Sequence, residues 1–386
     1  MDIFNLDHKY ITPVYSRFPV AIKSGKGSIA VGSDGKEYID LAAGIAVNTF
    51  GIADNSWIEA VTNQANQLQH TSNLYYTEPA VLLAKELCER SNMEQVFFSN
   101  SGAEANECMI KAARQYFAEN HPERTEILTL TNSFHGRTLA TLAATGQPKF
   151  HEHFLPLPEG FVYTDPNLTD IEAKLEAGTI GAIMLEVVQG EGGVNLLSEE
   201  LLTGIARICQ EQDILLLIDE IQTGNGRTGK LFAYEHFNLE PDLITTAKGL
   251  AGGLPLGATL FGEKVKDILG PGMHGSTFGG NPICCAAGLN ILERLTDELL
   301  ESVSKKGNLI QATLENAAGV LAVEGLGLMQ GITTEKPAAE VVQDCLDHGV
   351  LVIQAQHKLR LLPALNIPED LLTKALEILR QAIKSN

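Results

Sequence analysis

Two residues in different segments carry side chains that suggest chemistry. Asp219 follows the apolar run Ile214–Ile218, and Lys248 lies between Ala247 and Gly249 in a short turn. A buried strand that delivers a carboxylate at its carboxyl end requires a cationic group opposite it, because an unpaired buried charge is costly. Pyridoxal 5′-phosphate (PLP) suits both residues, since it binds covalently to a lysine and its pyridinium nitrogen takes an acidic partner. The pair therefore predicts a PLP site.

A phosphate site is predicted where the segment Phe97–Glu107 changes from an apolar strand, through a Ser/Gly turn, into a helix. Free backbone N–H groups at a helix N-terminus attract anions, and Ser101 can add a hydroxyl donor. Taken alone, the segment is better explained as an ordinary serine N-cap; the presence of Lys248 favours the phosphate site. A second glycine-rich segment, Gly275–Pro282, offers Thr277 as a further donor, with a flexible domain connector as the alternative.

Other motif-like segments are predicted to be accidental. Gly224–Lys230 spells both G-x-G-x-x-G and G-x-x-x-x-G-K. A dinucleotide site should begin directly at the strand end, and a P-loop needs Ser or Thr where this chain has Leu231. The His151–His153 segment lacks further ligands at metal-site spacing, so we expect no metal. No G-x-S-x-G elbow is present, which disfavours a serine hydrolase.

The composition excludes several classes of protein. The 386 residues carry 28 basic and 48 acidic side chains, a net charge of −20, which argues against binding nucleic acids or anionic membrane surfaces. Six cysteines without a C-x-x-C pair indicate neither a disulfide framework nor a zinc site. We expect no signal peptide, and no apolar stretch reaches the ~18 residues of a membrane span. A cytoplasmic location is expected.

Alternation of strand-like and helix-like segments predicts an α/β fold with a mainly parallel sheet. We expect a large domain over residues 46–290 and a smaller α+β domain built from residues 1–45 and 291–386. The expected strands are 95–98, 126–130, 181–186 and 214–218, with a hairpin over 28–40 and short strands within 320–333 and 349–362. The expected helices are 56–69, 79–90, 104–120, 198–211, 284–300 and 369–384.

Together the motifs resemble those of the class III (ornithine-type) aminotransferases, which are fold-type I enzymes that use PLP. The resemblance runs from Tyr15–Val20 to Leu359–Pro363, and its specific elements are SNSGAEANE, SFHGRT, EVVQGEGGV, LLLIDEIQTGNGRTG, TTAKGL and HGSTFGGNP. Within the class, Ala43–Asn48 and His70–Tyr76 look most like acetylornithine aminotransferases. The resemblance implies a homodimer with shared active sites.

The resemblance also implies a role for each residue that matches a cofactor motif. Lys248 would carry PLP as a Schiff base and move a proton between substrate and cofactor, while Asp219 would keep the pyridinium nitrogen protonated. Gln222 would contact the phenol oxygen, and Phe134 would stack on the ring. The residues implied to bind the phosphate are Ser101, Gly102, Ala103 and, reaching across from a second subunit, Thr277.

The implied substrates are N-acetylornithine as amino donor and 2-oxoglutarate as acceptor, the latter becoming glutamate. Both donors, N-acetylornithine and glutamate, carry carboxylates, which the planar fork of Arg reads bidentately. Arg137 and Arg360 match the family's carboxylate binders, and Glu191 matches an acid that pairs with Arg360 when glutamate is absent. Tyr15 and Ser276 complete the implied substrate-binding set.

Alternatives remain open at this stage. The same chemistry could act on succinylornithine, succinyl-diaminopimelate, 4-aminobutyrate or ornithine, and the small Gly44 could leave room for an acylated amine. A different class, a nucleotide-binding module, would use the Gly224–Lys230 segment. Two segments depart from the family pattern: Phe50–Ser56 replaces a His-x-His-Pro segment, and Glu324 stands where relatives usually carry Arg.

Overall fold

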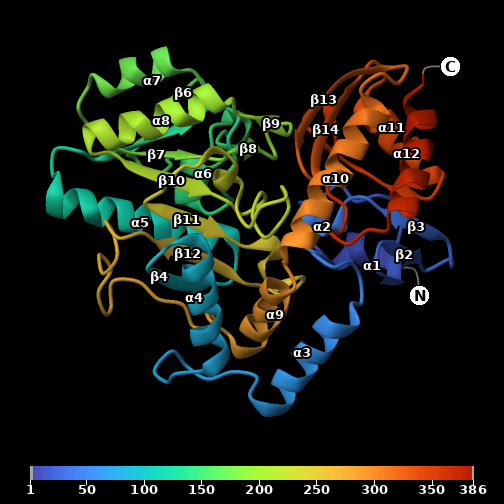
Figure 1. Ribbon diagram of the computed structural model, residues 1–386, viewed down its shortest axis with the longest axis horizontal. Coiled ribbons are helices and arrows are strands. Elements are labelled where there is room, and N and C mark those ends of the chain that lie inside the picture. Colours follow the sequence, from blue (N-terminus) through green and yellow to red (C-terminus); the bar gives the residue numbers. More distant parts are fainter. Residues whose placement is uncertain (1–2, 385–386) are drawn as a thin grey trace.

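The structure is a computed structural model that describes residues 3–384. Figure 1 shows two bodies: a larger one around a central sheet, and a smaller one that holds both ends of the chain. Among residues 3–384, no helix combines the length and the apolar character needed to cross a membrane.

The larger body is organised by a seven-stranded sheet in the order β4-β12-β11-β10-β7-β5-β6. Only β12 runs antiparallel to its neighbours, so the predicted mainly parallel α/β sheet is confirmed. The central strands β7 and β10 are buried along their whole length, as strands covered by helices on both faces must be. The strands are β4 (Gln95–Ser99), β5 (Glu126–Leu130), β6 (Phe161–Thr164), β7 (Ile180–Leu185), β10 (Leu215–Asp219), β11 (Leu243–Thr246) and β12 (Gly257–Phe261).

Helices surround this sheet (Figure 1). The longest, α5, is buried along one face and contacts β4, β10, β11 and β12. The N-terminus of α5 follows the carboxyl end of β4. This connection places the N-terminus of α5 beside the carboxyl ends of β10 and β11. The helices of this body are α3 (Asn55–Gln67), α4 (Glu78–Ser91), α5 (Gly102–Asn120), α6 (Leu139–Ala144), α7 (Leu168–Leu175), α8 (Glu199–Gln212) and α9 (Pro282–Glu293).

The smaller body joins the two ends of the sequence. β2 and β3 form the predicted hairpin, and β3 then pairs in parallel with β15 from the far end of the chain. A second sheet has the order β13-β14-β17-β16. This pairing supports the division into 46–290 and 1–45 with 291–386, which remains a proposal. The strands are β1 (Ile22–Lys26), β2 (Ile29–Gly32), β3 (Glu37–Asp40), β13 (Val320–Leu326), β14 (Met329–Thr334), β15 (Val350–Leu351), β16 (Ile353–Ala355) and β17 (Lys358–Leu361).

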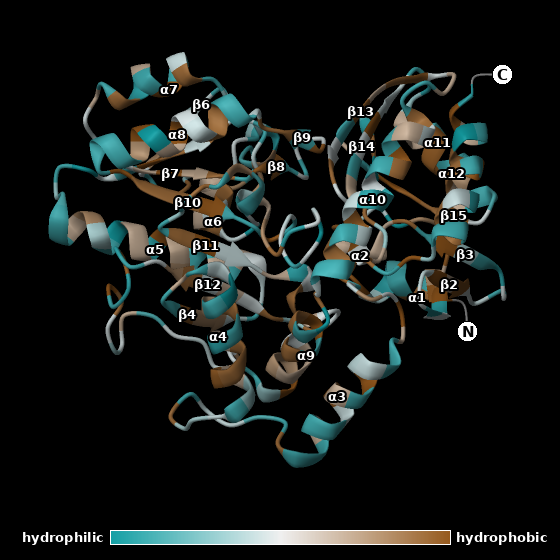
Figure 2. Cartoon of the chain, in the orientation of Figure 1, coloured by the Kyte–Doolittle hydropathy of each residue, from teal (hydrophilic) through white to brown (hydrophobic). Residues whose placement is uncertain are grey.

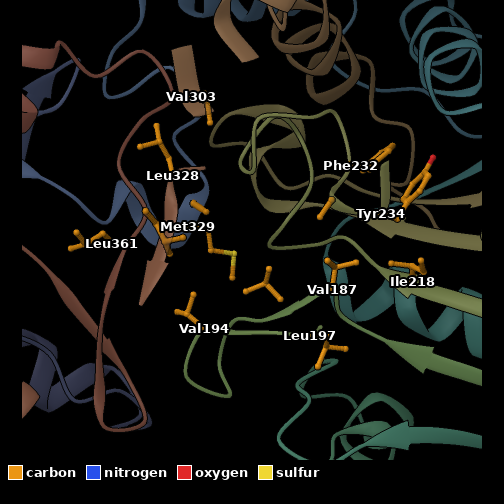
Figure 3. Packing of buried hydrophobic residues seen from close by; sticks show 14 of the residues in the cluster. Val187, Val194, Leu197, Ile218, Phe232, Tyr234, Val303, Leu328, Met329 and Leu361 are labelled. Carbon is orange, nitrogen blue, oxygen red and sulfur yellow. The ribbon is translucent and has the colours of Figure 1, made fainter. Parts of the chain in front are cut away.

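The hydrophobic core is continuous between the two bodies. The brown strands at the centre of each body in Figure 2 mark where apolar residues gather. Figure 3 shows Val194 of the larger body among Leu328, Met329 and Leu361 of the smaller one, and all four are fully buried. The contact fixes the short hairpin of β8 (Val188–Gln189) and β9 (Asn195–Leu196) against the second sheet.

One expected helix is wrong. Instead of a single helix over 284–300, the chain forms α9 and then α10 (Asp297–Leu314). The first helix ends at Glu293. Thr296 caps the second, because its hydroxyl accepts the N–H of Leu299, and Asp297 and Glu298 favour a helix start. The other expected helices lie within two residues of the observed bounds. The remaining helices are α1 (Ile3–Tyr10), α2 (Ala43–Ala46), α11 (Ala338–Asp347) and α12 (Glu369–Ile383).

Candidate active site

A cavity of about 440 Å³ lies at the carboxyl edge of the seven-stranded sheet. The strand order explains its position, because ligand sites of such sheets form beyond the carboxyl ends of the strands. Eight of the predicted site residues line it: Ser101, Gly102, Ala103, Phe134, Arg137, Asp219, Gln222 and Lys248. Residues that are far apart in the sequence are therefore brought to one place.

The carboxylate of Asp219 ends β10 at the floor of this cavity and is almost fully buried. Its Oδ2 atom lies 2.8 Å from Asn106 Nδ2 and 2.8 Å from His135 Nδ1, and Oδ1 accepts the N–H of Ile221 at 3.0 Å. These donors fix the carboxylate with its free side toward the cavity. Sequence reasoning missed Asn106 and His135 as members of the site, although both lie in the motifs SNSGAEANE and SFHGRT.

Lys248 follows β11 with a backbone that few residues adopt. Its φ is +42°, in the left-handed region, a conformation that persists only where the surroundings enforce it. Asn225 supplies that enforcement, because its Nδ2 donates to Thr246 Oγ1 at 2.8 Å and to the carbonyl of Ala247 at 3.1 Å. Burial lowers the pKa of the Lys248 amine, against the opposing effect of Asp219 and other charges. The neutral amine, a base and nucleophile, is thereby favoured.

The N-terminus of α5 forms the other end of the cavity. Ser101 caps the helix, since its Oγ accepts the N–H of Glu104 at 3.2 Å. The first N–H groups of a helix have no partner within it, which leaves those of Gly102 and Ala103 for a ligand. A Cβ at Gly102 would lie 2.8 Å from the side chain of Ile221, so only glycine fits there. This end can hold a phosphate.

Arg360 is the buried cation of the second predicted carboxylate site. Its NH1 donates to Glu191 Oε1 at 2.5 Å and to Gln222 Oε1 at 3.0 Å, while its buried Nε has no partner among residues 3–384. Burial would raise the pKa of Glu191, but Arg360 outweighs it and holds the pKa below its usual value. The predicted pairing of Arg360 with Glu191 is thus present, and it is buried, since Arg360 is 3% exposed.

Glu186 is a buried acid of the cavity wall that sequence reasoning did not single out, although it begins the motif EVVQGEGGV. Its oxygens accept the N–H groups of Phe134 at 2.9 Å and Gly190 at 3.3 Å. Burial raises its pKa to about 7, with His135 opposing and Asp219 adding to the rise. Glu186 therefore holds the Phe134 backbone at the cavity wall.

Arg137 lies at the exposed rim of the cavity. Its guanidinium is 4.3 Å from the ring centre of Phe150 and 5.4 Å from that of Phe134. The stacking fixes the planar group while leaving its N–H donors for a ligand.

Five predicted residues do not line the cavity: the paired Glu191 and Arg360 described above, and Tyr15, Ser276 and Thr277. Tyr15 is 69% exposed, and Thr277 is exposed as well. Ser276 lies nearer, because its Oγ accepts Asn100 Nδ2 at 3.1 Å. A role for Thr277 from a second subunit is compatible with its position outside this cavity and stays a prediction, as do the roles of Tyr15 and Ser276.

The lookalike segments do not form ligand sites. Gly224–Lys230 is a series of turns followed only by a short 3₁₀ helix, Ala233–Phe237, so it lacks the α-helix N-terminus that binds pyrophosphate. His151 Nε2 instead lies 2.9 Å from the carbonyls of Leu142 and Thr145. Among residues 3–384, no group of three His, Cys, Asp or Glu side chains could hold a metal ion.

Comparison with known proteins agrees with this geometry. The model of the family "aminotransferase class-III" matches residues 10–383. The acetylornithine aminotransferase of Haemophilus ducreyi is 48% identical over 385 residues, 99% of this chain and 98% of the relative.

Two solved structures share the fold. The N-acetylornithine aminotransferase of Stenotrophomonas maltophilia K279a has a TM-score of 0.84 at 35% identity, covering 98% of both chains. The ornithine aminotransferase of Toxoplasma gondii ME49 has a TM-score of 0.95 at 29% identity, covering 99% of this chain and 94% of the other. The family match covers nearly the whole chain, and one cavity holds the buried Lys248, the fixed Asp219 and a helix N-terminus that can bind phosphate. The chain therefore belongs to the class III aminotransferases, which are PLP-dependent enzymes.

Proposed function

We propose that this enzyme moves the side-chain amino group of N-acetylornithine to 2-oxoglutarate, giving N-acetylglutamate 5-semialdehyde and glutamate, a step of arginine biosynthesis. The observation that carries the proposal is the buried Arg360 with a carboxylate, Glu191, as its replaceable partner. The names of the relatives that align over nearly the whole chain support the choice of donor.

The cavity residues fit PLP from end to end. The N–H groups of Gly102 and Ala103, with Ser101, would bind the phosphate, and Asp219 would face the ring nitrogen. Phe134 would cover the ring and Gln222 would contact the phenol oxygen. The bare Cα of Gly190 leaves space for Gln222, because a Cβ there would lie 2.4 Å from its side-chain oxygen. When bound, the cofactor supplies an electron sink at the carbon that loses a proton.

The reaction requires one residue to take up and return protons, and Lys248 is placed to do so. Its lowered pKa favours the neutral amine, the form that can accept a proton from the substrate carbon and return one in the reverse direction. Asn106, His135 and the N–H of Ile221 hold the oxygens of Asp219 in place opposite it. Asn225 keeps the lysine backbone in place during both transfers.

Two different donors must use the same site in turn. Glutamate brings a second carboxylate, which would replace Glu191 on Arg360. N-acetylornithine would leave the Arg360–Glu191 ion pair closed and place its own carboxylate at Arg137. A pair that opens for one substrate and stays closed for the other lets a single cavity accept both.

The second candidate donor is free ornithine, because the backbone matches an ornithine aminotransferase with a TM-score of 0.95, against 0.84 for the N-acetylornithine aminotransferase. The wall near Val47 favours the acylated donor. Val47 lines the active-site cavity, and Gly44, three residues earlier in the chain, lines an apolar cavity of about 460 Å³. With no side chain at Gly44, space remains for an acyl group.

A homodimer is proposed as the working unit. Four large apolar side chains on two neighbouring loops are 60–100% exposed: Leu74, Tyr75, Tyr76 and Phe278. Asn73 Nδ2 ties these loops together by donating to the carbonyls of Ser276 and Gly279, both at 3.0 Å. A surface of this kind favours contact with a second copy, which would bring Thr277 to the other cavity. We also propose a cytoplasmic location, supported by six free cysteines.

The proposal is tested by the specificity constant kcat/KM with 2-oxoglutarate as acceptor. N-acetylornithine is expected to exceed ornithine, succinylornithine and 4-aminobutyrate, with glutamate as a product in every case. A higher constant for another amine would keep the enzyme class and replace the donor. Light scattering of the holoenzyme tests the dimer, and a monomer would contradict it.

A further inference from the structure

Lys358 is a buried cation that has no role in the reaction proposed above. It lies on β17 two residues before Arg360, so both side chains leave the same face of the strand. The side chain of Lys358 is only 8% exposed. Its Nζ donates to Asn195 Oδ1 at 3.0 Å and pairs with the carboxylate of Glu324.

The contact with Asn195 reaches the loop that carries Glu191. Asn195 begins β9, and its Nδ2 donates to the carbonyl of Gly192 at 2.8 Å. Gly192 is the neighbour of Glu191, so two consecutive hydrogen bonds join Lys358 to the residue beside the ion-pair partner of Arg360. The strand β17 thus holds both ends of this short loop: Arg360 holds Glu191, and Lys358 holds Asn195.

Packing keeps the loop close to the sheet. Gly331 on β14 pairs with Arg360, and a Cβ at Gly331 would lie 2.7 Å from Val194 Cβ. The bare backbone at this position lets the loop rest directly on the sheet. Glu324 pairs with Gly331 from the other side and supplies the counter-charge of Lys358. An arginine at position 324 would face Lys358 with a like charge.

We propose that Lys358 is a positioning residue: by holding Asn195 it keeps Glu191 over Arg360, and so sets how readily a substrate carboxylate replaces Glu191. The inference rests on the proposed function, in which glutamate and 2-oxoglutarate open this ion pair. Loss of the tether frees the loop, weakens the closed Arg360–Glu191 pair, and makes Arg360 more available to an incoming carboxylate.

The test measures binding of glutarate, a dicarboxylate that cannot react, to the PLP-loaded dimer by titration calorimetry. Lys358→Met and Asn195→Ala are each expected to bind glutarate about fivefold more tightly than the wild type, at the low end of coupling between two sites. The double variant is expected to match either single variant, because both break one tether. Lys358→Arg restores a donor and should return the wild-type affinity. The KM for 2-oxoglutarate should fall in parallel while kcat changes less.

A control separates position from charge. Glu324→Gln keeps the Lys358–Asn195 contact, so its glutarate affinity should equal that of the wild type. If Lys358 acted only through its charge, Lys358→Met would bind glutarate more weakly, Glu324→Gln more tightly, and Asn195→Ala as the wild type does. That pattern, or equal affinity in all variants, would overturn the inference alone. Absence of glutarate binding by the wild type would overturn the proposed acceptor as well. If Lys358→Met fails to fold, Asn195→Ala carries the test.

Discussion

Replacement of Arg227 by methionine tests how the two bodies are held together beside the active site. Arg227 lies in the segment that spells the nucleotide-binding motifs, and it is 2% exposed. Its NH1 donates to the carbonyls of Leu328 at 3.1 Å and Pro363 at 2.5 Å, both in the smaller body. Burial lowers the pKa of Arg227 to about 9, so the side chain is still a cation at pH 7.

The expected cost follows from the two carbonyls. Each buried acceptor left without a donor costs about 1–3 kcal/mol. Removal of the buried cation also removes its own desolvation cost, which offsets part of this destabilisation. We therefore expect a net loss of about 2 kcal/mol in the free energy of unfolding. For a chain of 386 residues the unfolding entropy is about 0.8 kcal/mol/K, which converts the loss into a fall in Tm of about 2–3 °C.

Differential scanning calorimetry of the holoenzyme measures the shift. Arg207→Met is the matched control, because Arg207 is an exposed arginine, with a side chain 58% exposed, that pairs with Glu211 at 3.4 Å. Such surface pairs contribute about 0–1 kcal/mol, so the control should move Tm by less than about 1 °C. Equal shifts in the two variants would show that the contacts of Arg227 do not join the bodies.

Three further substitutions probe the site. Glu191→Gln should lower the KM for 2-oxoglutarate about 5- to 30-fold in steady-state kinetics, because the Glu191 carboxylate no longer competes for Arg360. The magnitude follows from a charged hydrogen bond of ~1.5–3 kcal/mol, discounted for the partial exposure of Glu191. An unchanged KM would contradict this. Gly102→Ala should weaken PLP binding about tenfold in a fluorescence titration, since the added Cβ must displace Ile221, and full retention would refute the tight fit. Burial raises the pKa of Glu220 to about 7, above its unfolded value, so between these two pKa values the native state holds a proton that the unfolded state releases. The free energy of unfolding should therefore fall by up to about 3 kcal/mol as pH rises from ~4.5 to ~7. Glu220→Gln should flatten that slope in urea titrations, and an identical slope would contradict the assignment.

Local signals were enough to predict part of the site. Asp219 and Lys248 stand out because a charged residue after an apolar strand is unusual, and Ser101 because it precedes a helix. The Arg360–Glu191 pair came from resemblance to a family. The observed ion pair supports it, since a lone arginine within an apolar strand needs an acidic partner.

The remaining features depend on contacts between distant segments. Asn106 and His135 reach Asp219 from 113 and 84 residues away, and no local pattern specifies such a meeting. The helix break before Thr296 was missed because the helical spacing of apolar residues continues across it. The Thr296 hydroxyl caps a new helix there, which the spacing alone does not reveal. For Glu324, the sequence showed only an unusual charge, and the fold was needed to place Lys358 beside it.

We propose that this PLP-dependent transaminase accepts N-acetylornithine, and this donor assignment decides its function. It is tested most directly by the visible absorption spectrum of the purified holoenzyme before and after N-acetylornithine is added without an acceptor. We expect a band of the lysine-bound cofactor that disappears as the amino group is transferred and returns when 2-oxoglutarate is supplied. A band that persists with N-acetylornithine but disappears with ornithine or another amine would contradict the proposed donor. A protein that develops no band even with added PLP would contradict the account of the site itself.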